Sequence, residues 1–557
     1  MSKRILVGVA WPYANGPLHL GHLAGCYLPA DIFARYHRMA GNDVLMVSGS
    51  DQHGTPVTVR AEAEKCSPAE VADRYDQSFQ DTFQRLGMQW DLFTRTTTDN
   101  HREVVQDIFR KLHAKGYLYP ATQTMLYDPE VESFLPDRFV EGTCPHCGFT
   151  QARGDQCDSC GRTLDAMELK EPRSKRSGAT PVPRETTHLF FKWSAFTEKL
   201  EQYVAGKGWW RPNVINFTRR YLQEGLVDSA VTRDLAWGIP VPIEGFQDKA
   251  IYVWFEAVIG YFSASIEWAR SKGEPEAWKR WWLDPAAETY YFVGKDNIPF
   301  HSIRWPAVLI GLEEGLNLPH NVPANEFLNL EHQPFSTSRN WAVWANDFLD
   351  RYDPDPLRYY LTVNAPESND SDFLWHEFLR KNNDELVAAW GNLAQRVTTF
   401  TRKNFEGKVP PATPNAEDEA ILKAAADTFP AAAELLEQCR FKAALQRIFE
   451  TVREGNRYLD GQEPWKTIKV DRDRAATAVA TSLRLIAALR VLLTPFLPNS
   501  SARLHAVLGL EGDPWAGPWA PPDLKEGHSL GEVAPLFKKL EDSIVEEERG
   551  RLGQPVA

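Results

Sequence analysis

The sequence lacks the features that would place the protein in a membrane or outside the cell. No unbroken apolar run approaches the roughly 18 residues that a membrane-spanning helix needs, and the first residues contain no apolar region typical of a secretion signal. Internal repeats and low-complexity segments are also missing. We therefore expect a soluble, cytoplasmic protein with no membrane partner.

The chain also lacks an excess of positive charge and contains few cysteines. The net charge of −13 gives no sign of a nucleic-acid partner, although a local basic face could still bind phosphates. Only seven cysteines occur in 557 residues, and four of them are clustered. This pattern favours a metal site in a reducing compartment over a disulfide framework. The length predicts three or four domains, at about 150 residues each.

The first stretch with chemical information follows a short apolar run at residues 5–10, which predicts a buried strand. Gly16 begins a turn, and a helix is expected from about His19. His19 and His22 would share one face of its first turn, where backbone N–H groups and the helix dipole favour phosphate. Gly21 has no Cβ, so a flat ring could approach the backbone. The alternative is a chance tetrapeptide on a helix face.

A second strand is predicted at residues 43–50, and Asp51 follows its carboxyl end. Ligand groups in open α/β sheets come from these ends, so Asp51 could pair with a substrate ammonium. A turn or helix cap is the other interpretation of Asp51. Residues 68–87 and 99–115 have the periodicity of amphipathic helices.

Residues 116–229 are rich in proline and glycine and contain two C-x2-C pairs. Nine residues separate Cys144-Pro-His-Cys147 from Cys157-Asp-Ser-Cys160. Each pair can wrap a tight turn around one metal, and four thiolates complete a tetrahedron with no open position. The spacing therefore predicts a structural zinc, against the alternative of two disulfides.

Alternating α/β structure resumes near residue 230. Residues 251–256 have the pattern of a strand end, with a helix expected from about Ala257, and residues 290–296 predict another strand before a helix that opens at Asn297. Several rings would meet in one pocket that suits a thioether, with His301 or Tyr13 able to form a weak hydrogen bond to sulfur. These rings are Trp254, Tyr261, Phe300, His301 and Trp305. For any single ring, an ordinary core position is the alternative.

From about residue 385 the pattern is helical and predicts a bundle. Asn392 and Arg396 are four residues apart and share a face. Together with Trp465 they could offer hydrogen bonds and a stacking platform to unstacked bases; ordinary helix surface is the alternative. A proline-rich stretch at 513–522 precedes a charged tail, which is expected to form a helix with a solvated face.

Two of these segments carry a family resemblance. Residues 12–22, PYANGPLHLGH, resemble the first signature motif of class I aminoacyl-tRNA synthetases in the methionyl-tRNA synthetase form. Residues 51–56, DQHGTP, resemble the segment whose aspartate binds the amino group of methionine in that family. The resemblance implies that His19 and His22 bind ATP phosphates, that Gly21 lies against adenine, and that Asp51 holds the substrate amine.

The resemblance also implies a methionine pocket and further catalytic residues. Trp11 and Val258 stand where leucine and proline are common in the family, which leaves the pocket apolar but changes its shape. Arg233, Lys295 and Asp296 are expected to take part in catalysis. The implied pocket comprises Ala10, Trp11, Tyr13, Trp254, Ala257, Val258, Tyr261, Asn297, Phe300, His301 and Trp305.

Residues 329–339 align with the second class I signature, the mobile K-M-S-K-S loop over the ATP phosphates. Pro334 and Thr337 occupy the places of both lysines, while Ser336 and Ser338 remain and Arg339 follows. We expect these loop residues to act in catalysis, with Thr337 near ATP and Arg339 supplying part of the missing charge. The alternative is that Arg339 pairs with a carboxylate such as Asp347.

We therefore predict a methionine–tRNA ligase with an α/β Rossmann-like catalytic domain, an inserted zinc-knuckle domain and a C-terminal all-α anticodon domain. Its substrates would be methionine, tRNA(Met) and ATP with Mg²⁺. We also expect one structural Zn²⁺ per chain and a monomeric protein. A paralogue with a non-tRNA acceptor and a silent tRNA-binding protein are the rival hypotheses. The expected divisions are 1–115 and 230–325 (catalytic), 116–229 (insertion), 326–384 (loop and stem contact), 385–525 (bundle) and 526–557 (tail).

Overall fold

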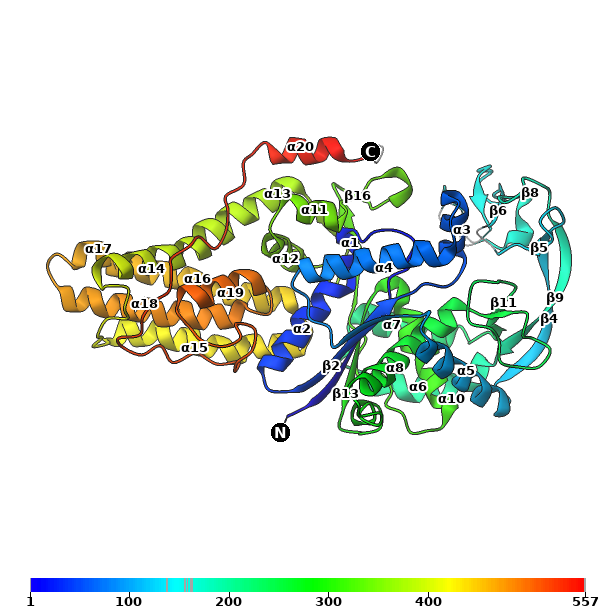
Figure 1. The fold of residues 1–557 in the computed structure, drawn as a ribbon, viewed down its shortest axis with the longest axis horizontal. Helices are drawn as coiled ribbons and strands as arrows, with labels where there is room; N and C mark the ends of the chain where they lie inside the picture. Colours follow the sequence, from blue (N-terminus) through cyan, green and yellow to red (C-terminus); the bar gives the residue numbers. More distant parts are fainter. Residues whose placement is uncertain (1, 137–138, 155–156, 158, 161–163, 555–557) are drawn as a thin grey trace.

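The molecule is elongated, with a central sheet, a helical bundle at one end and a small β-rich unit at the other (Figure 1). The structure is a computed structural model that describes residues 2–136, 139–154, 157, 159–160 and 164–554. The expected fold class is confirmed. The bundle and the β-rich unit lie on opposite sides of the sheet that carries the first motif.

A parallel five-stranded sheet in the order β14-β13-β1-β2-β3 forms the centre. Val7 on β1 lies between Met46 on β2 and Tyr290 on β13. Near-continuous apolar runs suit such strands because helices cover both faces. The strands come from both sides of the insertion: β1 Arg4–Val9, β2 Asp43–Ser50, β3 Leu92–Arg95, β13 Glu288–Gly294 and β14 Ala324–Asn325.

The predicted helices around this sheet are present, with one boundary in error. The expected strand at 251–256 reduces to β12 Ala250–Ile251, and α8 already begins at Val253. A short apolar run fits strand and helix equally well. The surrounding helices are α1 Leu20–His22, α2 Leu28–Met39, α3 Thr55–Glu64, α4 Pro68–Arg85, α5 Asp99–Ala114, α8 Val253–Ser271 and α10 Trp305–Leu312; π-helical turns at Leu23–Tyr27 and Phe300–Arg304 precede α2 and α10.

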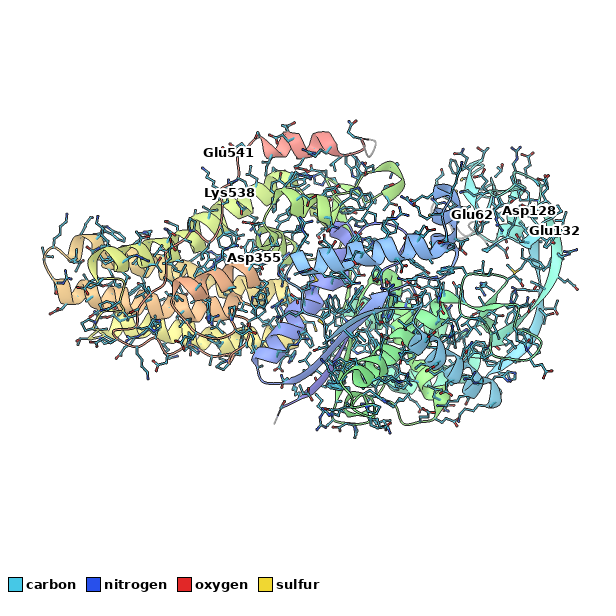
Figure 2. All side chains as sticks on the ribbon, in the orientation of Figure 1. Glu62, Asp128, Glu132, Asp355, Lys538 and Glu541 are labelled. Carbon is cyan, nitrogen blue, oxygen red and sulfur yellow. The ribbon has the colours of Figure 1, made fainter. Side chains whose placement is uncertain are left out.

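The inserted segment consists of a long antiparallel ribbon and a small sheet at its tip. Arg176 joins this tip to the catalytic unit: its guanidinium forms an ion pair with Glu62 of α3 at 3.0 Å and donates to Ser133 at 3.0 Å. Glu62 lies beside the tip in Figure 2. The elements are β4 Leu118–Asp128, β5 Ser133–Phe134, β6 Val140–Thr143, β7 Ala152–Arg153, β8 Lys170–Ser174, β9 Val182–Phe191, α6 Thr197–Ala205, α7 Pro212–Gln223 and β10 Ser229–Ala230.

The rest of the chain is helical apart from a three-stranded sheet, β16-β15-β17. In the described part of the chain one helix, α18, is apolar and long enough to cross a membrane, but 94% of its most apolar window is buried. It is the core helix of the bundle. The elements are β15 Leu328–Leu330, β16 Gln333–Pro334, α11 Ala345–Arg351, α12 Pro354–Val363, β17 Ser371–Phe373, α13 Trp375–Arg380, a π-helical stretch Lys381–Gly391, α14 Asn392–Asn404, α15 Ala416–Glu437, α16 Phe441–Gln462, α17 Pro464–Thr467, α18 Arg472–Leu493, α19 Pro498–Val507 and α20 Ile544–Arg551.

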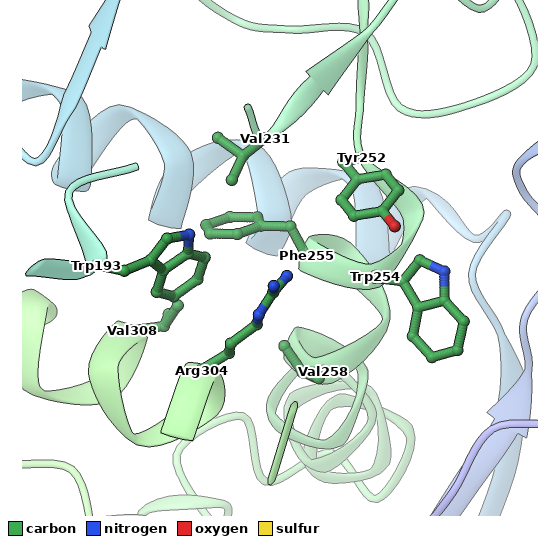
Figure 3. Close-up of a pocket in the computed structure, with 8 residues that line it drawn as sticks. All are labelled: Trp193, Val231, Tyr252, Trp254, Phe255, Val258, Arg304 and Val308. Atoms are coloured by element: carbon green, nitrogen blue, oxygen red, sulfur yellow. The ribbon is translucent and has the colours of Figure 1, made fainter. Parts of the chain in front are cut away.

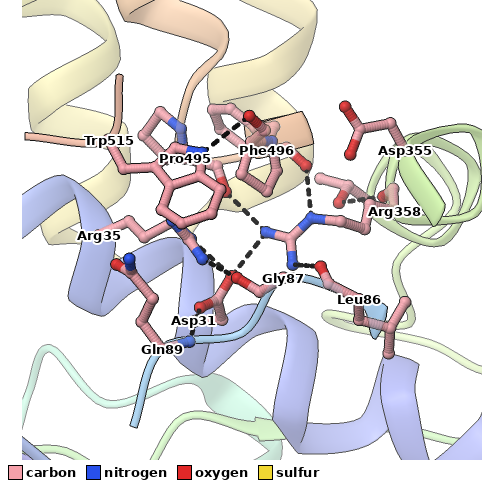
Figure 4. Close-up of polar contacts among 12 residues, drawn as sticks. Asp31, Arg35, Leu86, Gly87, Gln89, Asp355, Arg358, Pro495, Phe496 and Trp515 are labelled. Atoms are coloured by element: carbon pink, nitrogen blue, oxygen red, sulfur yellow. Dashed lines mark hydrogen bonds and ion pairs between the residues drawn. The ribbon is translucent and has the colours of Figure 1, made fainter. Parts of the chain in front are cut away.

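A buried polar network joins the bundle to the catalytic unit (Figure 4). Arg358 of α12 donates to Asp31 of α2 at 2.7 Å, to the Phe496 carbonyl at 2.8 Å and to the Pro495 carbonyl at 2.9 Å. Arg35 donates to the same Asp31 oxygen at 3.0 Å. Both arginines and Asp31 are buried, so removal of one partner would leave an uncompensated charge.

Candidate functional site

The two histidines of the first motif lie together at the start of the α1–α2 helix. His19 is the N-cap; its Nδ1 accepts from the Gly21 N–H at 3.1 Å, while His22 Nδ1 accepts from the His19 N–H at 3.1 Å. The rings stack with centroids 3.7 Å apart. Because each Nδ1 accepts a hydrogen bond, each neutral imidazole carries its proton on Nε2. The pair therefore presents two N–H donors beside a helix N-terminus.

Burial determines the charge of this pair. It lowers the pKa of His19 well below its ordinary value, and the neighbouring His22 lowers it further. His22 is more exposed at the surface, yet desolvation of its ring also lowers its pKa to about 4. Both imidazoles are therefore neutral near pH 7 in this state. They can donate hydrogen bonds to phosphate oxygens, but they carry no positive charge. A cation that balances the phosphate charge must come from elsewhere.

Phe335 from the second signature covers this site. Its ring stacks on His19 with centroids 4.6 Å apart and an angle of 11° between the planes. A Cβ added at Gly21 would lie 3.6 Å from the same ring. The flat surface at Gly21 is thus covered by an aromatic side chain, so a ligand ring could reach it only after Phe335 moves.

Asp51 lies at the carboxyl end of β2, as predicted. Its backbone pairs with that of the first motif, since the Asp51 N–H donates to the Pro12 carbonyl and the Ala14 N–H donates to the Asp51 carbonyl, both at 2.8 Å. Tyr13 lies between these two contacts and faces Asp51 in an isolated β-bridge. Within the described residues, the buried Oδ1 of Asp51 has no hydrogen-bond partner. An unpartnered buried carboxylate oxygen of this kind suits a substrate cation.

Glu256 is a second carboxylate in this region that the sequence did not single out. It is fully buried on the first turn of α8, and His53 Nδ1 lies 2.9 Å from one oxygen. Burial raises the pKa of Asp51 well above its ordinary value, and the charge of Glu256 raises it further. The sequence did contain a signal for Glu256: it is a lone acidic residue directly after Phe255 in an apolar run. Acidic side chains are almost never fully buried unless they are paired, so such a position points to a specific role.

Three predicted pocket rings form one continuous cluster. Tyr13 contacts Trp254 edge-on with centroids 5.7 Å apart, and Trp254 stacks on Phe300 at 4.5 Å. Trp254, Ala257, Val258 and Tyr261 follow one another at helical spacing along α8. This first turn of α8, missed as a helix in the sequence, sets their common direction.

His301 and Tyr261 form a buried hydrogen-bonded pair. His301 Nδ1 donates to the Asn297 carbonyl at 2.9 Å, which makes Nε2 the acceptor of the Tyr261 hydroxyl at 2.7 Å. Burial lowers the pKa of His301 to about 4, so the ring is neutral. Both ring nitrogens are engaged. A hydrogen bond to sulfur was expected from His301 or Tyr13; from His301 it would require exchange of one of these two bonds, and the ring otherwise offers an aromatic surface.

Trp11, which stands where leucine is common in the family, packs closely on two glycines. Cβ atoms added at Gly49 and Gly260 would lie 2.5 Å and 2.7 Å from its indole, so only glycine fits at either position. Ala10, by contrast, is engaged through its backbone, with its N–H on the Phe292 carbonyl at 3.0 Å. Trp305 is fully buried and donates to the Tyr291 hydroxyl at 3.1 Å, a core position.

A small apolar pocket opens behind Trp254 (Figure 3). Trp254 and Val258 are the predicted pocket residues that line it; Arg304 reaches into it, with its guanidinium 5.0 Å from the Phe300 ring. Its lining is Trp193, Val231, Tyr252, Trp254, Phe255, Val258, Arg304 and Val308. Movement of the Trp254 ring would therefore connect this space with the Tyr13–Phe300 cluster.

The predicted catalytic cations outside the loop are already engaged. Lys295 Nζ forms ion pairs with Asp370 at 2.8 Å and Glu326 at 3.0 Å. Arg233 lies on the Tyr252 ring, 3.9 Å from its centroid, and donates to the carbonyls of Ala230 and Thr232. Asp296 follows Lys295 in a 3-10 turn. Any contact of Lys295 with a nucleotide would require exchange of its two carboxylates.

The altered signature loop closes on itself. Ser336 and Trp341 exchange two backbone hydrogen bonds of 2.9 Å, and Thr337 begins a 3-10 turn that ends at Arg339. Arg339 Nε donates to Ser336 Oγ at 3.1 Å. Within the described residues it forms no ion pair with Asp347, the expected alternative partner. The side chain of Ser338 lies outside the described part of the structure.

The four clustered cysteines converge at the tip of the insertion. Their Sγ atoms all lie within 4.8 Å of one another, and all four thiols are free of disulfides. Cys144 and Cys160 are 3.9 Å apart, and Cys147 and Cys157 are 3.6 Å apart. A tetrahedron with Zn–S bonds of about 2.3 Å has edges of about 3.8 Å. The arrangement therefore fits a zinc ion, and the disulfide alternative is excluded for these side chains.

The three candidate base-reading residues gather at the far end of the bundle. Arg396 of α14 lies over the Trp465 ring at 4.6 Å and forms an ion pair with Asp460 at 2.7 Å. Asn392 begins α14, one turn before Arg396. Two of the three side chains thus contact each other directly, and Trp465 remains partly exposed.

Comparisons with known proteins agree with this geometry. Residues 5–398 match the tRNA synthetases class I (M), and residues 409–555 match the anticodon binding domain of methionyl tRNA ligase. The chain is 53% identical to the methionine–tRNA ligase of Thermomicrobium roseum, covering 99% of both chains. It is also 53% identical to that of Dehalococcoides mccartyi, over 99% of this chain and 100% of the relative.

A solved structure is similar in fold over almost the whole length. Mycobacterium tuberculosis methionyl-tRNA synthetase in complex with methionyl-adenylate superposes with a TM-score of 0.80 at 25% identity, over 96% of this chain and 100% of that one. The similarity therefore includes the sheet, the insertion and the bundle together.

Proposed function

The chain belongs to the methionine-specific class I tRNA synthetases, and on this premise we propose which of its residues carry out each part of the reaction. The enzyme ligates methionine to tRNA(Met) through methionyl-adenylate. A carboxylate oxygen of methionine attacks the α-phosphorus of ATP and pyrophosphate leaves; a terminal ribose hydroxyl of tRNA then attacks the methionyl carbonyl and AMP leaves. Catalysis consists of orientation and stabilisation of charge.

We assign the methionine amino group to Asp51, and the unpartnered Oδ1 of this buried carboxylate is the observation that carries the assignment. The side chain would enter between Tyr13, Trp254 and Phe300, whose rings suit a thioether. Glu256 adds negative potential behind Asp51, which favours the ammonium form of the substrate. The assignment leaves His301 as a neutral wall of the pocket.

The phosphates are assigned to the two imidazoles and the loop. His19 and His22 would donate from Nε2, with Gly21 as the contact surface for adenine after Phe335 moves. Neutral imidazoles do not balance the charge on departing pyrophosphate, so Arg339 takes part of the role of the missing lysines together with Mg²⁺ bound to ATP. The hydrogen bond from Arg339 to Ser336 Oγ supports this, because it keeps the guanidinium within the loop.

One structural zinc is assigned to Cys144, Cys147, Cys157 and Cys160. The ion would hold the tip of the insertion in one shape, and Arg176 would transmit that shape to α3 through Glu62. The tRNA anticodon is assigned to Asn392, Arg396 and Trp465. We keep the divisions at 115, 229, 325, 384 and 525, and we propose a monomer in the cytoplasm, which light scattering and cell fractionation would test.

Arg339→Ala tests the assignment of the loop. Loss of one preorganised transition-state donor lowers kcat by about 10²–10³-fold, so pyrophosphate exchange should fall by this factor with little change in the KM for methionine. Thr337→Lys added to Arg339→Ala should restore much of the rate. Exchange at the wild-type rate in Arg339→Ala would remove Arg339 from the site. No exchange in the wild type would favour the silent tRNA-binding alternative.

A further inference from the structure

The end of the chain returns from the bundle to the catalytic unit, where α20 lies over α13 and β16 (Figure 1). On the way it is attached to the π-helical stretch before α14: Asn382 donates to the Lys538 carbonyl at 3.1 Å, and Asn383 exchanges bonds of 2.9 Å and 3.0 Å with the backbone of Leu540. Figure 2 places Lys538 and Glu541 along this path. The segment is thus held before α20 begins.

Glu548 then sets the orientation of α20. Its side chain is only 4% exposed and accepts from Arg351 Nε at 2.7 Å and Nη2 at 2.9 Å. The Tyr352 hydroxyl donates to it at 2.9 Å. A two-pronged contact between arginine and carboxylate fixes direction as well as distance. With Glu548 held, the next residue, Arg549, faces Glu331, the residue directly before the loop.

The loop at residues 332–339 is gripped at its first end by this arginine. Arg549 donates to one oxygen of Glu331 from Nε at 3.1 Å and from Nη2 at 2.8 Å. The other oxygen of Glu331 accepts from the Trp375 N–H at 2.8 Å. Glu331 has a φ of +47°, a backbone conformation that residues other than glycine rarely adopt. The side-chain contacts hold it there.

The second end of the loop is held by the residues after α20. The Gly553 N–H donates to the Asn340 carbonyl at 3.0 Å, and the Asn340 side-chain amide donates to the Gln554 carbonyl. Asn340 is also left-handed, with a φ of +49°. The same short segment therefore contacts both residues between which the loop is closed.

We propose that residues 544–554 position the signature loop for the ATP step, with Arg549 as the positioning residue that acts through Glu331. The inference rests on the function proposed for the loop. A loop without lysines depends on one guanidinium, so the place of its two ends determines where Arg339 stands. A group held out of position loses transition-state interactions although ground-state binding persists.

Arg549→Gln removes the guanidinium and keeps a polar side chain that is too short to make the same contact. We expect kcat for pyrophosphate exchange to fall about 10-fold, with unchanged melting temperature and unchanged methionine binding in the absence of ATP. Glu331→Gln should have the same effect, and the double variant should be no worse than either single one. The matched control is Arg551→Gln, an arginine on the same helix with a 3.8 Å contact to Glu548 and none to the loop within the described residues.

Hydrogen exchange of the peptide spanning 331–341 measures the loop directly. We expect exchange of this peptide to accelerate in Arg549→Gln and not in Arg551→Gln. Unchanged exchange, or equal effects in both variants, would overturn the inference, as would a loss of methionine binding without ATP. Faster loop exchange with an unchanged turnover would also overturn the inference, because the segment would then hold the loop without any effect on the ATP step; the role of the loop itself is decided by Arg339→Ala.

Discussion

The phenyl ring of Phe335 lies flat on the imidazole of His19, with 4.6 Å between centroids and 11° between planes. The two residues come from the first and second signature segments, so the loop contacts the helix N-terminus directly. A nucleotide base at Gly21 would have to displace this ring. The loop thus competes with part of its own substrate before it can assist in the reaction.

Phe335→Ala should therefore tighten the binding of a non-reactive ATP analogue. An aromatic pair contributes about 0.5–1.5 kcal/mol beyond its buried area, so the dissociation constant should fall about 2- to 10-fold. Isothermal titration calorimetry measures this without turnover. Phe134→Ala, which removes a ring from the insertion, is the control and should leave the affinity unchanged. Weaker binding in Phe335→Ala would mean that the ring supports the nucleotide instead.

The KM for methionine should depend on pH through Asp51. Its pKa is raised by burial and by Glu256, so the carboxylate takes up a proton as the pH falls, and the KM for methionine should rise in that direction. Glu256→Gln removes the second negative charge and lowers the pKa of Asp51, so the rise in the KM for methionine should occur at lower pH. The exposed Glu314→Gln is the control. An identical profile in wild type and Glu256→Gln would contradict the coupling.

Asp51→Ala should weaken the binding of methionine. A charge-assisted hydrogen bond contributes about 1.5–3 kcal/mol, which corresponds to an increase of about 10- to 150-fold in the KM for methionine. ATP affinity should change little because the imidazole pair remains. Steady-state pyrophosphate exchange with both substrates varied provides both constants. Unchanged constants for methionine would remove Asp51 from the pocket.

Purified enzyme should contain about one zinc per chain, bound by the four cysteines. Cys147→Ser should lose most of it and impair tRNA charging more than adenylate formation, because the metal stabilises the insertion and not the reacting atoms. Elemental analysis and the two assays decide this. Cys66→Ser, outside the cluster, should keep its zinc. Full zinc in Cys147→Ser would exclude the proposed ligand set.

Trp465→Ala should impair tRNA charging and leave adenylate formation nearly intact. Stacking of a base on an aromatic ring contributes about 1–3 kcal/mol, so charging of tRNA should fall by about 5- to 150-fold while pyrophosphate exchange persists. Trp209→Ala serves as the control, because Trp209 is also an exposed tryptophan but packs on His320 of the catalytic unit. Equal losses in both assays would make Trp465 structural.

Much of this organisation was predictable because the signals are local. Strand, glycine turn and histidine pair occur within the first 22 residues, and two matched C-x2-C pairs lie 9 residues apart. The strand expected at 251–256 failed because a run of five apolar residues before Glu256 has no clear periodicity of its own. Its environment decided for a helix: α8, which begins at Val253, packs on β2 and β3 of the central sheet.

The remaining features depend on contacts between distant parts of the chain. Arg549 and Glu331 are 218 positions apart, and Glu548 and Arg351 are 197 positions apart. The charged tail was expected to form a helix with a solvated face, yet the side chain of Glu548 in that helix is buried by its two partners. Likewise, the charge of Glu256 matters only because the fold brings it to Asp51. No pattern of nearby residues encodes such pairs.

The buried contact of Arg358 with Asp31 also bears on how a tRNA is chosen. Because this arginine binds the Phe496 and Pro495 carbonyls as well, it connects the bundle, to which we assign the reading of the anticodon, with the unit to which we assign adenylate formation. If this connection keeps the two sites at a fixed distance, a tRNA must match the separation of the two ends of the enzyme in length and curvature. A molecule with the right anticodon but a shortened or straightened body would bind at one end and leave its terminal ribose short of the methionyl group.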